Sequence, residues 1–359
     1  MKSSMRRREF LLSAAFAAAR RKSRHVVLFT SDGVRRQDLF GGMDATLVND
    51  KMADLRQRLW RPTAQERRAT LMPFFWNTLV PRGVLLGNMQ VTNRYRVSYP
   101  GYSEILTGRT QDEVIRGNDP VQNPTPSLFE FLKERSHLRK EQVAVFASWV
   151  RFHSIAEARR GSIYINAGYE ASPLPRDSAK VGLLNRLQMD ARYLDDSSRH
   201  DAFTFELAME YLAALQPEHL FISFDETDDW AHNKRYDQVL KSLEYFDRAL
   251  KTLWGYLQNS PKYRDSTTLV ITTDHGRGAT LDDYSGHGAK VAGAEQIWAA
   301  FIGPDTPAKG ELRDHPLRRQ CDIAPTILNL LGIENGAYPG MSGAIIPEAI
   351  GQVAMPASF

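Results

Sequence analysis

Residues 267–281, T-T-L-V-I-T-T-D-H-G-R-G-A-T-L, combine an expected strand with side chains that can bind a metal. The β-branched, apolar run 267–273 predicts a buried strand, which ends in Asp274-His275-Gly276. Aspartate and histidine both bind borderline divalent metals such as zinc, and open α/β sheets place their chemistry at the carboxyl ends of strands. A lone Asp-His pair is common in surface loops, so this interpretation depends on the other strand ends.

A second acidic segment follows another expected strand. Residues 219–224, H-L-F-I-S-F, predict a buried strand and lead into four carboxylates: Asp225, Glu226, Asp228 and Asp229. So many charges at a buried strand end favour a bound cation over a solvated acidic loop. His232 stands four residues after Asp228, so the two side chains share one face of a helix or lie close together in a loop.

Two further positions complete the candidate ligands. The apolar run 25–30 predicts a strand that leads into Asp32, a carboxylate at another strand end. His287 lies between two glycines, in an exposed and flexible stretch that suits a loop ligand. The alternative for His287 is a glycine-rich turn with an incidental histidine.

Ser98 is the candidate nucleophile. It opens the stretch 98–108, S-Y-P-G-Y-S-E-I-L-T-G, in which a tight Pro-Gly turn precedes an expected short helix. Backbone N–H groups and the dipole at a helix N-terminus favour an anion, although a plain turn with a capping serine is the alternative. Two divalent ions about 3.5–4 Å apart can activate a serine hydroxyl and bind the oxygens of the attacked group.

The elements around these residues alternate between strand and helix, which predicts an α/β fold with a largely parallel sheet. Further strands are expected at 83–91, 142–148 and 296–302, and helices at 65–80, 125–135, 202–215, 234–259 and 322–331. Residues 41–63 read as an irregular surface excursion. The pattern also breaks down over roughly 150–200, which we interpret as an inserted cap over the active edge of the sheet.

Composition excludes several classes of protein. The 359 residues carry 46 basic and 42 acidic side chains, with no basic stripe interleaved with aromatics, so we expect no nucleic-acid surface. The single cysteine, Cys321, excludes an internal disulfide and a cysteine-based metal cage. No apolar run reaches the roughly 18 residues of a membrane-spanning helix.

The N-terminus resembles a twin-arginine export signal. Arg7-Arg8-x-Phe10-Leu11 matches its core, a short apolar segment follows, and the alanines at 17–19 offer a cleavage site. We therefore expect residues 1–19 to be a signal read by the twin-arginine machinery, and residues 20–359 to be one exported catalytic domain, periplasmic or secreted. The alternative is a basic amphipathic helix that stays on a cytoplasmic protein.

Together, the ordered motifs resemble the alkaline phosphatase superfamily, in its type I phosphodiesterase/nucleotide pyrophosphatase and sulfatase-like branch, over residues 26–345. The motifs are V-V-L-F-T-S-D-G, S-Y-P-G-Y-S-E-I-L-T-G, D-D-W-A-H, T-T-D-H-G, G-H-G, and the tail D-I-A-P-T-I-L-N-L-L-G-I with P-G-M-S-G. The resemblance implies an alkaline-phosphatase-like sandwich, with a largely parallel sheet flanked by helices. In this family the reactive Thr or Ser stands nine residues before a Thr-Gly pair, which is the position of Ser98.

The resemblance also implies a ligand set for two divalent ions, usually zinc in this family. One ion would be held by Asp228, His232 and His287, and the other by Asp32, Asp274 and His275, with Ser98 bridging toward the second. Asn118 stands one residue out of register with an asparagine that contacts a phosphoryl oxygen. Arg277 is placed to reach a phosphate oxygen, and a structural salt bridge is its alternative.

Departures from the sulfatase pattern favour phosphorus as the attacked atom. Formylglycine sulfatases need C/S-x-P-x-R, and here Ser98-x-Pro100 is followed by Gly101-Tyr102 with no arginine. The resemblance therefore implies a metal-dependent hydrolase of small-molecule phosphoric mono- or diesters. The alternatives are sulfatase-like, phosphomutase or phosphonate hydrolase activity at the same metals, or a silent binding protein of the same fold.

Overall fold

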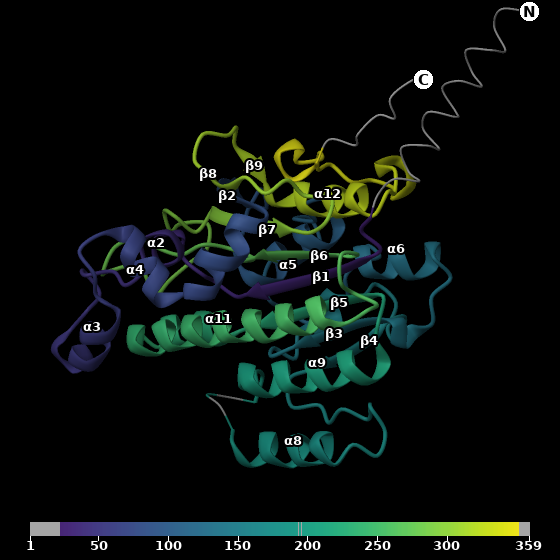
Figure 1. Ribbon diagram of the computed structural model, residues 1–359, viewed down its shortest axis with the longest axis horizontal. Helices are drawn as coiled ribbons and strands as arrows, with labels where there is room; N and C mark the ends of the chain where they lie inside the picture. The colour runs from purple at the N-terminus through teal and green to yellow at the C-terminus, as the bar shows by residue number, and fades with distance from the viewer. Residues whose placement is uncertain (1–21, 193, 195, 352–359) are drawn as a thin grey trace, which may run out of the picture.

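A nine-stranded sheet runs through the centre of the molecule (Figure 1), in the order β4-β3-β5-β1-β6-β7-β2-β8, with β9 beside β2. The computed structural model describes residues 22–192, 194 and 196–351, and the expected signal segment lies outside them. The strands are β1 (His25–Ser31), β2 (Val84–Gln90), β3 (Val143–Ala147), β4 (Tyr164–Ala167), β5 (His219–Phe224), β6 (Thr267–Thr272), β7 (Gln296–Ile302), β8 (Gly310–Leu312) and β9 (Arg318–Arg319). Only β7 runs antiparallel to its described neighbours, which confirms the expected α/β class.

Helices cover both faces of this sheet. They are α2 (Arg36–Gly41), α3 (Ala53–Leu59), α4 (Ala64–Leu71), α5 (Ser98–Thr107), α6 (Leu128–Arg135), α7 (Phe152–Ile155), α8 (Ala179–Asp190), α9 (Asp201–Leu215), α10 (Glu226–His232), α11 (Tyr236–Asn259) and α12 (Ile323–Leu330). Side chains of β1 alternate between two cores, because successive residues of a strand point to opposite faces. Val27 and Phe29 pack with α9 and α11, whereas Val26 and Leu28 pack with α5, α6 and α12.

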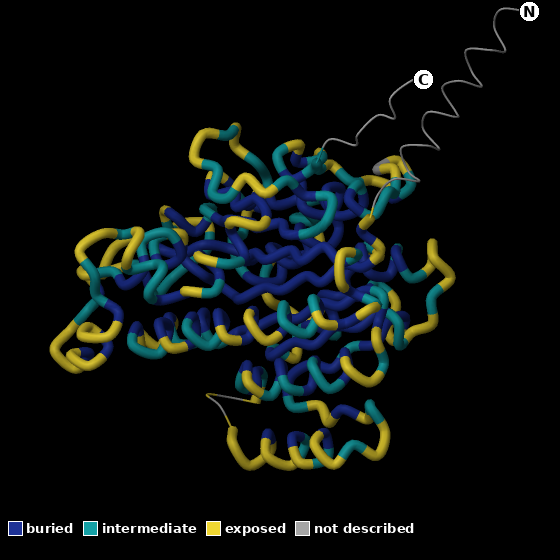
Figure 2. Tube along the Cα trace, in the orientation of Figure 1, coloured by how far each residue is buried: buried dark blue, intermediate teal, exposed yellow. Residues whose placement is uncertain are grey.

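The long helix α11 shows why the outer layers form as they do. Its apolar residues recur at helical spacing and are all buried: Val239, Leu243, Phe246, Leu250, Leu253 and Leu257. Figure 2 shows this buried stripe facing the sheet, with exposed residues on the outer side of the same helix. None of the described helices is long and apolar enough to cross a membrane.

Two segments differ from their sequence-based interpretation. The helix expected over 65–80 ends at Leu71, because Pro73 cannot continue it, and a π-helical turn follows at Phe75–Leu79. The excursion expected at 41–63 contains α3, whose Leu55 and Leu59 are buried. Residues 150–200 contain α7, the edge strand β4 and α8, which packs against α9 at the periphery (Figure 1).

The sheet register brings three chain segments to one edge. β1 is the central strand of this group, and it pairs in parallel with β5 on one side and with β6 on the other. Ser31 is opposite Phe224, and Thr30 is opposite Thr272. The carboxyl ends of β1, β5 and β6 therefore lie side by side, and Asp32, Asp228, Asp274 and His275 follow shortly after them.

Candidate metal and nucleophile site

The inner cluster consists of Asp32, Asp274 and His275, which follow β1 and β6. His275 Nε2 lies 3.4 Å from Asp32 Oδ1 and 3.4 Å from Asp274 Oδ2. All three side chains are buried, with at most 1 % of their surface exposed. One ligand atom from each residue falls within 4.8 Å of the others, which is the arrangement of a three-ligand metal site.

The carboxylates of the inner cluster fit a bound cation. Asp32 Oδ2 and Asp274 Oδ2 are buried and accept no hydrogen bond from the described residues. Burial raises the pKa of Asp32 well above its ordinary value, and the neighbouring Asp274 and Asp228 raise it further. Burial likewise raises the pKa of Asp274, with Asp228 adding to the effect. A divalent ion would remove the cost of holding these charges without partners.

His275 is oriented to give its lone pair to the same point. Its Nδ1 donates to the carbonyl of Gly276 at 2.9 Å, so Nε2 faces the carboxylates. Burial lowers the pKa of His275 well below its ordinary value, and His287 lowers it further. The neutral imidazole is the form that binds metals.

The outer cluster consists of Asp228, His232 and His287. Asp228 and His232 lie one turn apart on α10, and His232 Nε2 is 3.0 Å from Asp228 Oδ2 and 3.0 Å from His287 Nε2. His287 Nδ1 donates to the carbonyl of Arg96 at 3.1 Å, which turns its Nε2 toward Asp228. His232 is the open side of this cluster, since 46 % of its side chain is exposed.

The two clusters touch each other through His275. Its ring stacks on His287 with centroids 3.9 Å apart, and its Nε2 lies 3.8 Å from Asp228 Oδ1. Asp228, His275 and His287 consequently form another three-ligand group within 4.8 Å. Burial alone would raise the pKa of Asp228, but the Arg277 guanidinium, followed by His287 and His232, holds it well below its ordinary value.

Ser98 lies against the inner cluster. It is the first residue of α5, and its Oγ is 3.3 Å from His275 Nε2 and 3.5 Å from Asp32 Oδ1. A Cβ at Gly101 would overlap the backbone carbonyl of Asp274, so glycine is needed for α5 to approach β6 this closely. The hydroxyl of Ser103 instead accepts from Gln111 Nε2 at 2.6 Å, away from both clusters.

The remaining predicted residues occupy different surroundings. Asn118 is exposed, and its Oδ1 accepts the backbone N–H of Tyr99, next to Ser98, at 2.9 Å. Arg277 is buried and bonds to Asp228, which is the salt bridge weighed as its alternative. Of the four acidic residues after β5, only Asp228 belongs to a described three-ligand group, while Glu226 accepts from His200 and Asp201.

Two contributions to the site were not anticipated. Arg96 adopts a left-handed backbone with φ of 52°, which directs its carbonyl to His287, and nothing in the sequence marks this conformation. Gly33 has φ of 59° and donates its N–H to Asp274 Oδ1 at 3.1 Å. The Asp-Gly pair at the end of β1 was the available signal for that turn.

Comparison with known proteins gives one family match and a set of similar folds. The family model for sulfatases matches residues 24–333. The 2,3-bisphosphoglycerate-independent phosphoglycerate mutase of Haloquadratum walsbyi is 26% identical over 145 residues, which are 40% of this chain and 27% of the mutase. The alignment thus spans about a quarter of the length of that curated relative.

The similar solved structures cover nearly the whole chain. A 2-O GAG sulfatase has a TM-score of 0.59 at 14% identity, covering 91% of this chain and 74% of that one. The phosphonate monoester hydrolase of Agrobacterium radiobacter has a TM-score of 0.59 at 14% identity, with coverages of 92% and 78%. A protein of the alkaline phosphatase superfamily from Vibrio parahaemolyticus has a TM-score of 0.53 at 14% identity, with coverages of 90% and 69%. These likenesses confirm the expected fold, and the family match over residues 24–333 confirms the expected superfamily.

Proposed function

This chain belongs to the sulfatase family, and from that premise we propose that it hydrolyses small-molecule phosphoric esters with Ser98 as nucleophile beside two divalent ions. The family and fold support an enzyme that acts on sulfate or phosphate esters. The observation that carries the choice of Ser98 is its position, with Oγ 3.3 Å from His275 Nε2 and 3.5 Å from Asp32 Oδ1.

Tyr102 supports phosphorus over sulfur as the attacked atom. It stands where the formylglycine motif needs an arginine, it is buried, and its hydroxyl accepts from Ser223 Oγ at 3.1 Å. A phenol cannot supply the cation that would accompany oxidised Ser98 in the sulfatase pattern. The chain therefore lacks that part of the sulfatase machinery, whereas a serine alkoxide on phosphorus needs only the residues present.

The residues around Ser98 have separable tasks in this mechanism. Metal ions at the two clusters would supply Lewis-acid charge to the phosphoryl oxygens and lower the pKa of the Ser98 hydroxyl. His275 Nε2 and Asp32 Oδ1, the candidate ligand atoms nearest to Ser98 Oγ, place the hydroxyl beside the inner ion's position, where the ion would lower its pKa so that the proton is lost to water. Attack by Oγ forms a phosphoseryl bond as the alcohol leaves, and water then releases phosphate from Ser98.

Asn118 is proposed to contact the phosphoryl group. Its Oδ1 is held by the Tyr99 N–H, so the amide group is fixed beside the N-terminus of α5. The Nδ2 of the same amide is a donor that can reach an anionic oxygen at Ser98. The helix N-terminus and this amide together favour negative charge on the group attacked.

A substrate panel tests the proposed function. We expect the zinc-loaded protein to hydrolyse aryl phosphate monoesters or diesters, and to lose this activity on chelation. Aryl sulfates and phosphonate monoesters serve as the competing substrates in the same panel. Hydrolysis of sulfates alone would contradict the proposal and revive a sulfatase site.

The identity and number of ions are part of the proposal. Histidine and carboxylate ligands at both clusters suit zinc; the two three-ligand groups among the described residues share His275, and His232 would supply the third ligand of the outer ion in its place. Elemental analysis of the purified protein should give close to two zinc ions per chain. One calcium ion and no zinc would contradict this assignment.

We further propose export through the twin-arginine route, on the basis of Arg7 and Arg8 in the leader. Replacing both with lysine should leave the precursor in the cytoplasm, because that machinery reads the arginine pair. Cell fractionation with an immunoblot measures this outcome. An unchanged periplasmic yield from the variant would contradict the route.

A further inference from the structure

Arg277 joins three of the four chain segments that carry the candidate metal ligands. Its Nη2 donates to the backbone carbonyl of Asp228 at 3.0 Å and contacts Asp228 Oδ1. Its Nη1 donates to the carbonyl of Ser285 at 2.7 Å, two residues before His287. The arginine itself follows His275 by two residues, so one side chain links the end of β6, α10 and the loop that delivers His287.

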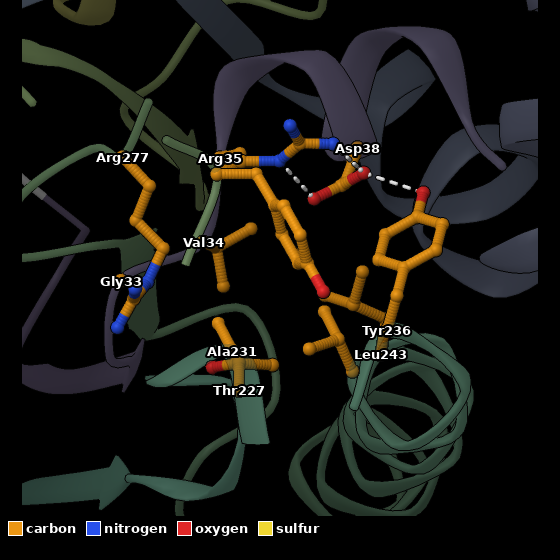
Figure 3. A pocket seen from close by; sticks show the side chains of 11 residues that line it. Gly33, Val34, Arg35, Asp38, Thr227, Ala231, Tyr236, Leu243 and Arg277 are labelled. Atoms are coloured by element: carbon orange, nitrogen blue, oxygen red, sulfur yellow. Dashed lines mark hydrogen bonds and ion pairs between the residues drawn. The ribbon is translucent and has the colours of Figure 1, made fainter. Parts of the chain in front are cut away.

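The position of Arg277 does not suit a substrate ligand. Only 1 % of the residue is exposed, and both terminal nitrogens are used by Asp228 and Ser285. Its Nε, which has no hydrogen-bond partner among the described residues, belongs to a side chain that lines a small cavity of about 10 Å³. Figure 3 shows Arg277 on one side of this cavity, which has room for about one water and none for a phosphate group.

A second buried arginine fixes the backbone directly after Arg277. Arg35 Nη1 donates to the carbonyl of Gly278 at 3.3 Å, and its Nη2 pairs with Asp38 Oδ1 at 2.7 Å. The hydroxyl of Tyr236, from α11, donates to the same Asp38 oxygen at 2.8 Å (Figure 3). Arg277 is therefore anchored at its backbone by this pair and at its guanidinium by the ligand-bearing segments.

Gly33 leaves little freedom for Asp228 and Arg277 to move. A Cβ at this position would overlap Asp228 Oδ1 and would lie 2.9 Å from Arg277 Nε. The end of β1 thus packs directly on the contact between Asp228 and Arg277. A displacement of either side chain would be transmitted to the other and to the outer cluster.

We propose that Arg277 is a positioning residue that sets the geometry of the outer cluster, and that it does not bind substrate. This inference rests on the proposed function only in requiring that the outer cluster binds a metal. Two opposing effects act on that ion: the crosslink holds Asp228 in place, while the guanidinium charge repels a cation. Because the arginine spans three segments at fixed distances, we expect the crosslink to dominate.

Zinc titration of the metal-free, full-length protein tests this role by calorimetry. Arg277→Lys keeps the positive charge but cannot bond to Asp228 and Ser285 at the same time, and Arg277→Met removes both the charge and these hydrogen bonds. Both variants should weaken zinc binding at the outer cluster by about 10–100-fold, the usual effect of losing a group that orients a ligand, and leave the inner cluster unchanged. With an aryl phosphate, kcat should fall at limiting zinc and recover in excess zinc, with KM and inhibition by inorganic phosphate unchanged.

A matched control and a second variant keep the test decisive. Arg58→Lys makes the same change in a paired but exposed arginine, whose partner is Glu244, and should bind zinc as the unmodified chain does. Circular dichroism melts establish whether each variant is folded. If the Arg277 variants do not fold, Gly33→Ala disturbs the contact between Asp228 and Arg277 and should weaken zinc binding at the outer cluster. A folded Gly33→Ala protein with normal zinc binding overturns the proposal.

The other outcomes separate this inference from the proposed function. Unchanged zinc affinity with a loss of inhibition by phosphate would make Arg277 a substrate ligand. Tighter zinc binding in Arg277→Met would show that charge repulsion outweighs the crosslink. Either result overturns the positioning role while the unmodified chain remains an active, zinc-loaded hydrolase, whereas a chain that binds no zinc or hydrolyses no phosphate ester fails the proposed function itself.

Discussion

The inner and outer clusters are built from the same residue types and yet differ in what surrounds them. In the inner cluster, Asp32 and Asp274 are fully buried, and each has a carboxylate oxygen without a hydrogen-bond partner among the described residues. In the outer cluster, the charge of Asp228 is already compensated by Arg277, and His232 is open to solvent. The inner cluster therefore holds buried carboxylates that a cation could balance, whereas the charge of the outer cluster is partly balanced by the protein itself.

This difference predicts unequal affinities for the two ions. Two unpaired carboxylates in a buried setting attract a divalent ion more strongly than one carboxylate that shares its charge with a guanidinium. The exposed edge at His232 also gives water and chelators access to the outer position. We expect the inner ion to bind first during loading and to leave last during chelation.

The largest expected effect concerns Ser98, the proposed nucleophile, which borders the inner cluster. Ser98→Ala should lower turnover on the order of 10³-fold or more, because it removes the group proposed to attack the substrate. Both ions should remain bound, since three other residues form each cluster. Steady-state kinetics and elemental analysis of the same preparation measure the two properties.

Ser103→Ala is the matched control for that substitution, because it removes a buried hydroxyl from the same helix. Its Oγ bonds to Gln111 and touches neither cluster, so the loss should be at most about tens-fold. A larger loss of turnover in Ser103→Ala than in Ser98→Ala would contradict the assignment of Ser98 as the nucleophile.

A paired substitution of ligands separates the clusters directly. Asp274→Asn should lower activity by about 100-fold or more without recovery in excess zinc, since a metal ion contributes several kcal/mol of transition-state stabilisation. His232→Asn should give a smaller loss that excess zinc restores, because it removes an imidazole at the exposed edge of the outer cluster, whereas Asp274→Asn removes a buried carboxylate. Equal losses and equal recovery in the two variants would remove the distinction between inner and outer positions.

The smallest effect is on the stability of the metal-free protein. Burial raises the pKa of Asp274, so the folded chain holds the carboxyl proton more tightly than the unfolded chain does. That stabilisation is complete below the unfolded pKa of about 3.9 and is lost as the pH rises through the folded value. Asparagine carries no such charge, so metal-free Asp274→Asn should melt with the unmodified chain near pH 4 and above it at pH 8.

In a chain of this size, the melting temperature should shift by about 2 °C for each kcal/mol of change in the free energy of unfolding. In excess zinc at pH 8 the unmodified chain should instead have the higher melting temperature, because only it binds the inner ion with its full ligand set. If metal-free Asp274→Asn had a lower melting temperature at pH 8 than the unmodified chain, the Asp274 carboxylate would not destabilise the metal-free fold, which contradicts the prediction.

Sequence reasoning anticipated the inner cluster better than the outer one, for a physical reason. Buried strands such as β1 and β6 have an apolar pattern that is local, and their ends then place Asp32 and Asp274 side by side through parallel pairing. The break at Pro73 was equally local and was missed because the helical spacing of the surrounding residues was given more weight.

The support of the outer cluster depends on contacts between distant residues. Arg96 reaches its left-handed conformation with its N–H bonded to Asn93, whose own N–H is held by Glu104 of α5. The contact between Arg277 and Asp228 joins residues 49 positions apart. No spacing rule within one sequence encodes such contacts, so the role of Arg277 remained open between salt bridge and substrate ligand.

Trapping the reaction intermediate tests the proposed chemistry most directly. The zinc-loaded protein would be mixed with an aryl phosphate, quenched in acid and digested, and the peptide that contains Ser98 would be examined by mass spectrometry. The account predicts an unmodified Ser98 before reaction and a phosphate on Ser98 after the quench, with none on Ser103. Formylglycine at position 98, or phosphate on another residue, would contradict it.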